Sequence, residues 1–100
     1  MIILMGHIDL DLADVEAFEE DVHAIAPVVR AEPGCLFYSL ARQEATSGRM
    51  LLAQRWQDRA ALALHLQAPA TLAFQARWLP DMRMAIQQYD LAAPGAAQDG

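Results

Sequence analysis

The centre of the chain reads Glu-Pro-Gly-Cys-Leu-Phe-Tyr at residues 32–38 and Arg-Trp-Gln-Asp-Arg-Ala-Ala-Leu-Ala-Leu-His-Leu at residues 55–66. Pro-Gly is a turn dipeptide, and the apolar and aromatic run after it is typical of a β-strand. In the second stretch a strand ends at Trp56, Asp58 has the chemistry of a helix N-cap, and the following helix carries His65 among aliphatic residues. The pattern predicts a turn, two strands and a capped helix in succession.

The part before this centre predicts one strand and one helix. Residues 2–10 alternate on two faces that both begin apolar, which favours a strand covered on both sides. The helix runs from an N-cap at Asp14 to about Arg30, and Pro27 is expected to kink its last turns. Its apolar residues recur at helical spacing: Val15, Phe18, Val22, Ile25 and Val29.

The remaining elements follow from turn signals and apolar spacing. The expected elements are a strand at 35–42, a turn at 46–49, a strand at 50–57, a helix that starts at Asp58 and breaks at Ala68-Pro69, a helix at 70–79 and a half-buried strand at 82–89. The chain therefore predicts the order β-α-β-β-α-β. This is the ferredoxin-like α+β pattern, with a four-stranded antiparallel sheet and helices on one face.

The other face of such a sheet would be open, and several strands offer aliphatic side chains to it. We therefore expect a homodimer in which two sheets pack face to face. Residues 1–91 form the expected domain, and residues 92–100, rich in Ala, Pro and Gly, are expected to be a flexible tail.

Composition limits the class of protein. One hundred residues are enough for one domain, and 55% of them are hydrophobic, which we interpret as a surface that meets another subunit rather than as simple alanine richness. The net charge of −6 argues against nucleic acid and anionic membranes as partners. A single cysteine, no signal-peptide pattern and no long apolar run make a cytoplasmic protein the expectation.

His65 is the first candidate for chemistry. An imidazole titrates near neutral pH, so a histidine on the sheet-facing stripe of its helix could take a proton from a phenol or an activated C–H group. A buried histidine bonded to a backbone carbonyl is the structural alternative. His7 is the second candidate, because it shares a strand face with Asp9 and one could orient the other; a polar strand end near solvent is its alternative.

Three further residues could hold a planar, oxygen-bearing ring. Trp56 offers a flat surface and one N–H donor, and Gln54 on the same strand face offers a donor and an acceptor. Tyr38 could add a hydroxyl group. An ordinary core tryptophan at a strand end remains the alternative for Trp56.

No cofactor or metal is expected. The sequence has no glycine-rich phosphate loop, no nucleophile elbow and no nicotinamide or flavin fingerprint, and its three histidines lack the spacing of a zinc site.

Residues 55–66, together with 32–35, resemble the signature of the antibiotic biosynthesis monooxygenase family, and the resemblance extends from the first strand to about Tyr89. It implies a dimeric α+β barrel. It also implies a cofactor-independent monooxygenase that oxidises a small aromatic substrate, a quinol or polyketide anthrone, with O2. His65 would then be the base or the anion partner, Trp56 and Gln54 would hold the ring and its oxygen, and His7 would assist.

Other activities on the same fold remain open. One is a non-oxidative enzyme such as an isomerase, and another is a small-molecule-binding dimer without turnover. The resemblance also includes haem-degrading enzymes, which we place lowest. Gln75 stands where their axial histidine is expected, and His7 stands where they have asparagine. Gln54 occupies a position where family members often carry an acid.

Overall fold

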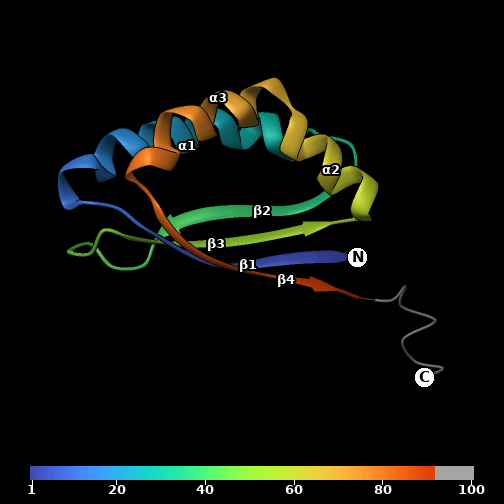
Figure 1. Cartoon of the computed structure of the whole chain (residues 1–100), viewed down its shortest axis with the longest axis horizontal. Coiled ribbons are helices and arrows are strands. Elements are labelled where there is room, and N and C mark those ends of the chain that lie inside the picture. Colours follow the sequence, from blue (N-terminus) through green and yellow to red (C-terminus); the bar gives the residue numbers. More distant parts are fainter. Residues whose placement is uncertain (92–100) are drawn as a thin grey trace.

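The computed structural model describes residues 1–91, which form a sheet covered by helices on one side (Figure 1). The elements in chain order are β1 Ile2–Asp9, η1 Leu12–Asp14, α1 Val15–Arg30, β2 Cys35–Arg42, β3 Arg49–Trp56, α2 Arg59–Gln67, α3 Pro69–Trp78, η2 Leu79–Asp81 and β4 Arg83–Asp90. The sheet order is β2-β3-β1-β4, and every neighbouring pair is antiparallel. The expected ferredoxin-like fold is confirmed.

The core lies between the sheet and the helices. On β3 the alternate residues Met50, Leu52, Gln54 and Trp56 are buried, which is the period-two pattern of a strand with one face covered. Phe18 of α1 meets them from above and contacts Trp78 of α3 edge-on, with ring centroids 5.1 Å apart. This apolar layer fixes α1 and α3 over the sheet.

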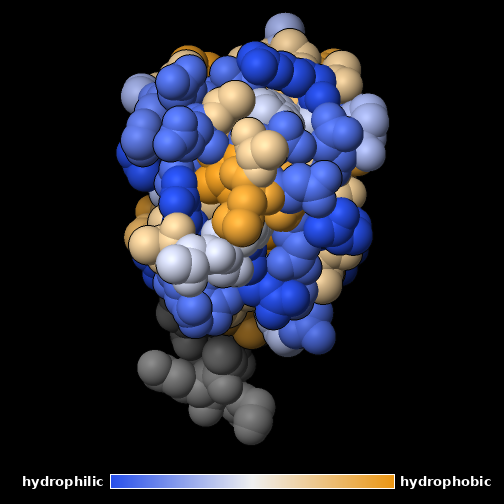
Figure 2. All heavy atoms as spheres, turned by 90° about the vertical axis from the view of Figure 1, so that its left-hand side faces the viewer, coloured by the Kyte–Doolittle hydropathy of each residue, from blue (hydrophilic) through white to orange (hydrophobic). Residues whose placement is uncertain are grey.

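The hydrophobic interior reaches the surface at the end of the molecule where the β2–β3 hairpin and the two short 3-10 helices lie. Figure 2 shows a hydrophobic patch there with hydrophilic residues around it. Leu12 of η1 and Leu79 of η2 are among the exposed large apolar residues. Apolar side chains between the sheet and the helices are therefore exposed at this end of the molecule.

Several details differ from the sequence-based expectations. Asp14 has a helical backbone and its side chain caps nothing, because a 3-10 turn precedes α1 and supplies its start. The helices cover only one face of β1, so Met5 on the far face is about half exposed in the single chain. Two expectations are confirmed: the carboxylate of Asp58 accepts from the Ala61 N–H at 2.8 Å, and the helix breaks at Ala68.

The expectation of a half-buried last strand is wrong. All eight residues of β4 are exposed, because β4 is an edge strand with β1 as its single neighbour in the sheet. Its side chains Met84 and Ile86 border a cavity instead of a packed helix. The tail expected at 92–100 lies outside the described residues.

The turn between α1 and β2 is tied to the start of α2. Gly34 has φ +80°, a conformation that side chains with a Cβ rarely adopt, and its carbonyl accepts from the Gln57 N–H at 2.8 Å. A Cβ built on Gly34 would lie 2.5 Å from Cβ of Ala61 in α2. Glycine therefore lets the turn approach α2 closely, which sets the position of the preceding Glu32.

We expect Gly34→Ala to lower the free energy of unfolding by about 1–3 kcal/mol, because the substitution combines a strained φ with a steric conflict. Urea unfolding followed by circular dichroism measures this loss. Thr46→Ala, in the exposed β2–β3 turn, is the matched control and should change stability little. Equal stability of Gly34→Ala and the wild type would show that the turn does not require glycine.

Candidate functional site

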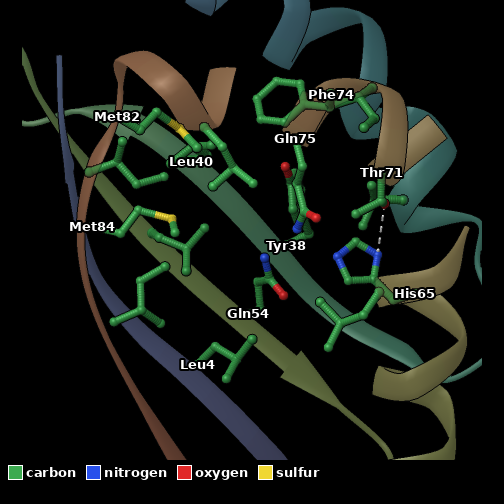
Figure 3. A pocket seen from close by; sticks show the side chains of 17 residues that line it. Leu4, Tyr38, Leu40, Gln54, His65, Thr71, Phe74, Gln75, Met82 and Met84 are labelled. Carbon is green, nitrogen blue, oxygen red and sulfur yellow. Dashed lines mark hydrogen bonds between the residues drawn. The ribbon is translucent and has the colours of Figure 1, made fainter. Parts of the chain in front are cut away.

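A cavity lies between the helix-covered face of the sheet and the helices (Figure 3). Its volume is about 130 Å³, and it opens to solvent at its mouth. Most of its lining is aliphatic, with Met82, Met84 and Ile86 on the β4 side. Five polar side chains also line it: Tyr38, Gln54, His65, Thr71 and Gln75.

His65 projects from α2 toward the sheet and is 5% exposed. Its Nδ1 lies 2.7 Å from Oε1 of Glu32, which belongs to the glycine-containing turn described above. The hydroxyl of Thr71 lies 3.4 Å from the same nitrogen (Figure 3). The imidazole is therefore held by two elements that are distant in sequence from each other.

This arrangement determines which nitrogen of His65 faces the cavity. An ionised carboxylate can only accept, so Nδ1 carries the proton in the neutral ring and Nε2 keeps its lone pair. Within residues 1–91, every side-chain nitrogen or oxygen that is inaccessible has a hydrogen-bond partner. Nε2 makes no hydrogen bond in this part of the chain, so it is accessible from the cavity that His65 lines.

Trp56 lies behind the cavity rather than in its wall. The indole is wholly buried and stacks on the His65 ring, with centroids 4.5 Å apart and an interplanar angle of 28°. Its Nε1–H donates to Oε1 of Gln54 at 2.9 Å. The expectation that Trp56 offers a flat surface to a ligand is therefore corrected, because His65 and Gln54 separate it from the space.

Gln54 and Tyr38 are neighbours on the floor of the cavity. They are paired residues of β3 and β2, and both side chains are buried. Burial raises the pKa of Tyr38 to about 12, although the Arg30 charge opposes this shift. The Tyr38 hydroxyl therefore stays protonated at neutral pH and can donate a hydrogen bond.

The structure does not bring His7 to this cavity. His7 lies on the opposite, open face of the sheet, with Nε2 3.6 Å from a carboxylate oxygen of Asp9. The Arg49 guanidinium donates to the two carboxylate oxygens of Asp9 from Nε at 2.8 Å and from Nη2 at 3.1 Å, and this hydrogen bonding holds the pKa of Asp9 below its usual value. His65, Gln54 and Tyr38 are thus brought together, whereas His7 is separated from them.

Two residues of the site were not singled out by their sequence pattern. Glu32 reads as part of a turn, and Thr71 reads as an ordinary helix residue. The available signal was indirect: a buried histidine needs a hydrogen-bond partner, and a carboxylate at the end of a helix is one candidate. Gln75 lines the cavity from α3, although the sequence suggested it only as a poor haem ligand.

Residues 1–91 contain no group of three His, Cys, Asp or Glu side chains placed to hold a metal ion. No helix in the same range is both long and apolar enough to cross a membrane.

An apolar cavity that holds a potential base beside two potential donors has the composition typical of small-molecule sites. The family model described as antibiotic biosynthesis monooxygenase matches residues 1–77. The chain belongs to this family.

Three similar proteins share sequence or fold with this chain. The chain is 32% identical over 68 residues to the uncharacterised protein sll1783 of Synechocystis; the match covers 68% of the chain but 46% of that relative. The structure of PA3566 from Pseudomonas aeruginosa has a TM-score of 0.78 and 29% identity, covering 92% of this chain and 94% of that one. A Deinococcus radiodurans protein, provisionally described as an antibiotic biosynthesis monooxygenase, has a TM-score of 0.82 at 21% identity, with 93% and 94% covered.

We expect Tyr38 to ionise at about pH 12, because its phenolate would be desolvated in the cavity. Tyr89→Phe leaves Tyr38 as the single tyrosine of the chain, so absorbance of the phenolate against pH reports this group alone. Since the pKa is raised in the folded state, stability should fall as pH rises above the unfolded value of about 10. A midpoint near pH 10 in the folded variant would contradict the burial of this hydroxyl.

Proposed function

We propose that this protein is a cofactor-independent monooxygenase that oxidises a small, electron-rich hydroxylated aromatic compound, of the quinol or anthrone kind, with O2. The observation that carries the proposal is the arrangement of the two ring nitrogens of His65. Its Nδ1 is bound to Glu32 at 2.7 Å, and its Nε2 is open to an apolar cavity. A histidine held in this way is suited to act as a general base.

The proposed first step is a proton transfer. Nε2 of His65 takes a proton from the ring carbon or hydroxyl of the substrate, and the electron pair stays on the substrate as a delocalised anion. The protonated imidazole is then stabilised by the carboxylate of Glu32. Because the surrounding lining is mostly apolar, this charge interaction is stronger than it would be in water.

Oxygen is the oxidant in the second stage. The anion gives electrons to O2, a carbon–oxygen bond forms, and the proton on His65 passes to the outer oxygen to give a hydroperoxide. His65 removes the remaining proton from that carbon, the O–O bond breaks, and the leaving hydroxide takes the proton as water. For an anthrone-like substrate the sum converts one ring methylene and one dioxygen molecule into one ketone carbonyl and one water. The carbon loses four electrons, and the dioxygen gains the same four.

The remaining polar groups would hold the oxygen of the substrate. Tyr38 and Gln54 lie side by side below His65 and can donate to an oxygen on which negative charge develops. Donors already aimed at such an atom lower the barrier without reorganisation during the reaction. The aliphatic and methionine side chains would contact the hydrocarbon part of the ring.

We expect His65→Ala to lower the turnover number for oxygen uptake by about 10²–10⁴, the usual contribution of a general base. Glu32→Gln should lower it by a smaller factor, because the imidazole stays but loses its charged partner. An oxygen electrode with a panel of quinols and anthrones measures this, using protein treated with a chelator. His23→Ala, on the exposed face of α1, is the matched control and should retain wild-type turnover.

Uptake that is unchanged in His65→Ala would remove the assignment of the base. Product formation without oxygen uptake would instead favour the non-oxidative isomerase. Binding of the aromatic compounds without turnover would favour a binding protein.

We also propose that the chain forms a homodimer through the open face of its sheet. Four large apolar side chains on this face, Met5, Phe37, Leu51 and Tyr89, are each about half exposed, and they come from all four strands. Exposed apolar side chains gathered on one sheet face are typical of a protein interface, and a two-fold axis would let the same face pack on itself.

Leu51→Glu should therefore convert a dimer of two 11.0-kDa chains into a monomer, because it places a charge within the proposed interface, on the inner strand β3. Light scattering after gel filtration gives the mass. Leu64→Glu is the matched control: Leu64 is also an exposed leucine but lies on α2, on the helix side, so this variant should remain dimeric. A monomeric wild type at micromolar concentration would overturn the proposal.

A further inference from the structure

We propose that Trp56 is a positioning residue: its indole N–H fixes the amide of Gln54 so that the cavity presents two hydrogen-bond donors to an acceptor oxygen of the ligand. The inference deepens the proposed function, since it concerns the same cavity and names the ligand group selected there. It is separable from catalysis because it is tested by binding alone.

The orientation of the Gln54 amide follows from its contact with Trp56. An indole N–H can only donate, so the atom 2.9 Å away must be the amide oxygen. Trp56 is wholly buried, so water does not reach its indole N–H to replace the amide oxygen of Gln54, which is itself 6% exposed. The amide nitrogen must then point away from the indole, and Figure 3 shows it directed into the cavity.

The opposite orientation is strongly disfavoured. It would place the amide nitrogen and its hydrogens against the indole N–H, so that two donors face each other in a buried position without an acceptor. Glutamine alone has no preference for either orientation, because its two ends are nearly equal in shape. The donor character of the cavity floor at Gln54 is therefore imposed by Trp56.

Tyr38 supplies the second donor. It is the paired residue of Gln54 on the neighbouring strand. In residues 1–91 every side-chain nitrogen or oxygen that is inaccessible has a hydrogen-bond partner, whereas the Tyr38 hydroxyl makes no hydrogen bond in that range. The hydroxyl is thus accessible from the cavity it lines. A carbonyl, enolate or phenolate oxygen has two lone pairs and can accept from two donors at once.

The test compares two probes that share a skeleton, 1-tetralone and tetralin, which differ in the carbonyl group. Their dissociation constants are measured by titration calorimetry without turnover. We expect the wild type to bind the ketone about 10-fold more tightly than the hydrocarbon, the effect of two neutral hydrogen bonds. Trp56→Phe should reduce this ratio at least about threefold while the affinity for tetralin stays within about twofold.

Two controls separate positioning from general damage. Trp78→Phe also removes an indole hydrogen bond, the partly buried one to Asp21 at 2.8 Å, but Trp78 does not line the cavity, so the binding ratio of this variant should equal that of the wild type. In a Gln54→Leu background, Trp56→Phe should cause no further change in the ratio. If Trp56→Phe does not fold, Trp56 replaced by 3-benzothienylalanine keeps the bicyclic ring, lacks the N–H and takes its place.

The proposal is overturned if folded Trp56→Phe keeps the wild-type ratio, if Trp78→Phe lowers the ratio equally, or if the wild-type ratio is near one. Failure to bind either probe also overturns it. If the wild type consumes no oxygen but Trp56→Phe lowers the binding ratio as expected, the positioning role is supported and the oxygenase is refuted. If the wild type consumes oxygen but Trp56→Phe leaves the binding ratio unchanged, the oxygenase is supported and the positioning role is refuted.

Discussion

The contact between the Glu32 carboxylate and the His65 imidazole, at 2.7 Å, is the interaction that the site depends on. Burying either group alone would be costly, and pairing them offsets that cost. The pair can form only if the turn after α1 comes close to α2, and this approach needs glycine at position 34. The backbone requirement of one turn thus fixes the chemistry of a residue on a helix far along the chain.

A second layer of contacts supports the first. Trp56 stacks on His65 and donates to Gln54, so one buried side chain contacts both the proposed base and a proposed donor. The cavity beyond these groups is lined mostly by aliphatic and methionine side chains, and Met84 and Ile86 form part of its wall on the exposed edge strand. The proposed reaction fits this division, since the substrate supplies the electrons and the protein supplies a proton acceptor and oriented donors. The two faces of the sheet then have separate proposed roles, chemistry under the helices and association on the open side.

Much of the fold could be predicted from sequence because local signals agreed with one another. Apolar spacing gave α1, turn residues gave the β2–β3 hairpin, and Ala68-Pro69 gave the break between α2 and α3. The exposure of β4 could not be predicted in this way, because it depends on which strand lies at the sheet edge. Asp14 failed as a cap because a 3-10 turn, which has no strong sequence signal, precedes the helix.

The site was partly predictable for the same reason. His65, Gln54 and Tyr38 lie where helix and strand periodicity placed them or allowed them, whereas Glu32 is 33 residues from its partner and carries no local sign of that contact. His7 was a candidate because it shares a strand face with Asp9, and the sequence did not reveal which face of β1 the helices cover. Pairing between distant segments, rather than local preference, decides these cases.

The most direct test of the central claim is the tautomer of His65, read from the ¹⁵N and ¹H correlations of its imidazole ring by NMR. The neutral ring should carry its proton on Nδ1, bound to Glu32, and leave Nε2 unprotonated toward the cavity. In Glu32→Gln this preference should weaken. A neutral His65 that carries its proton on Nε2 in the wild type would contradict its role as a base toward the cavity.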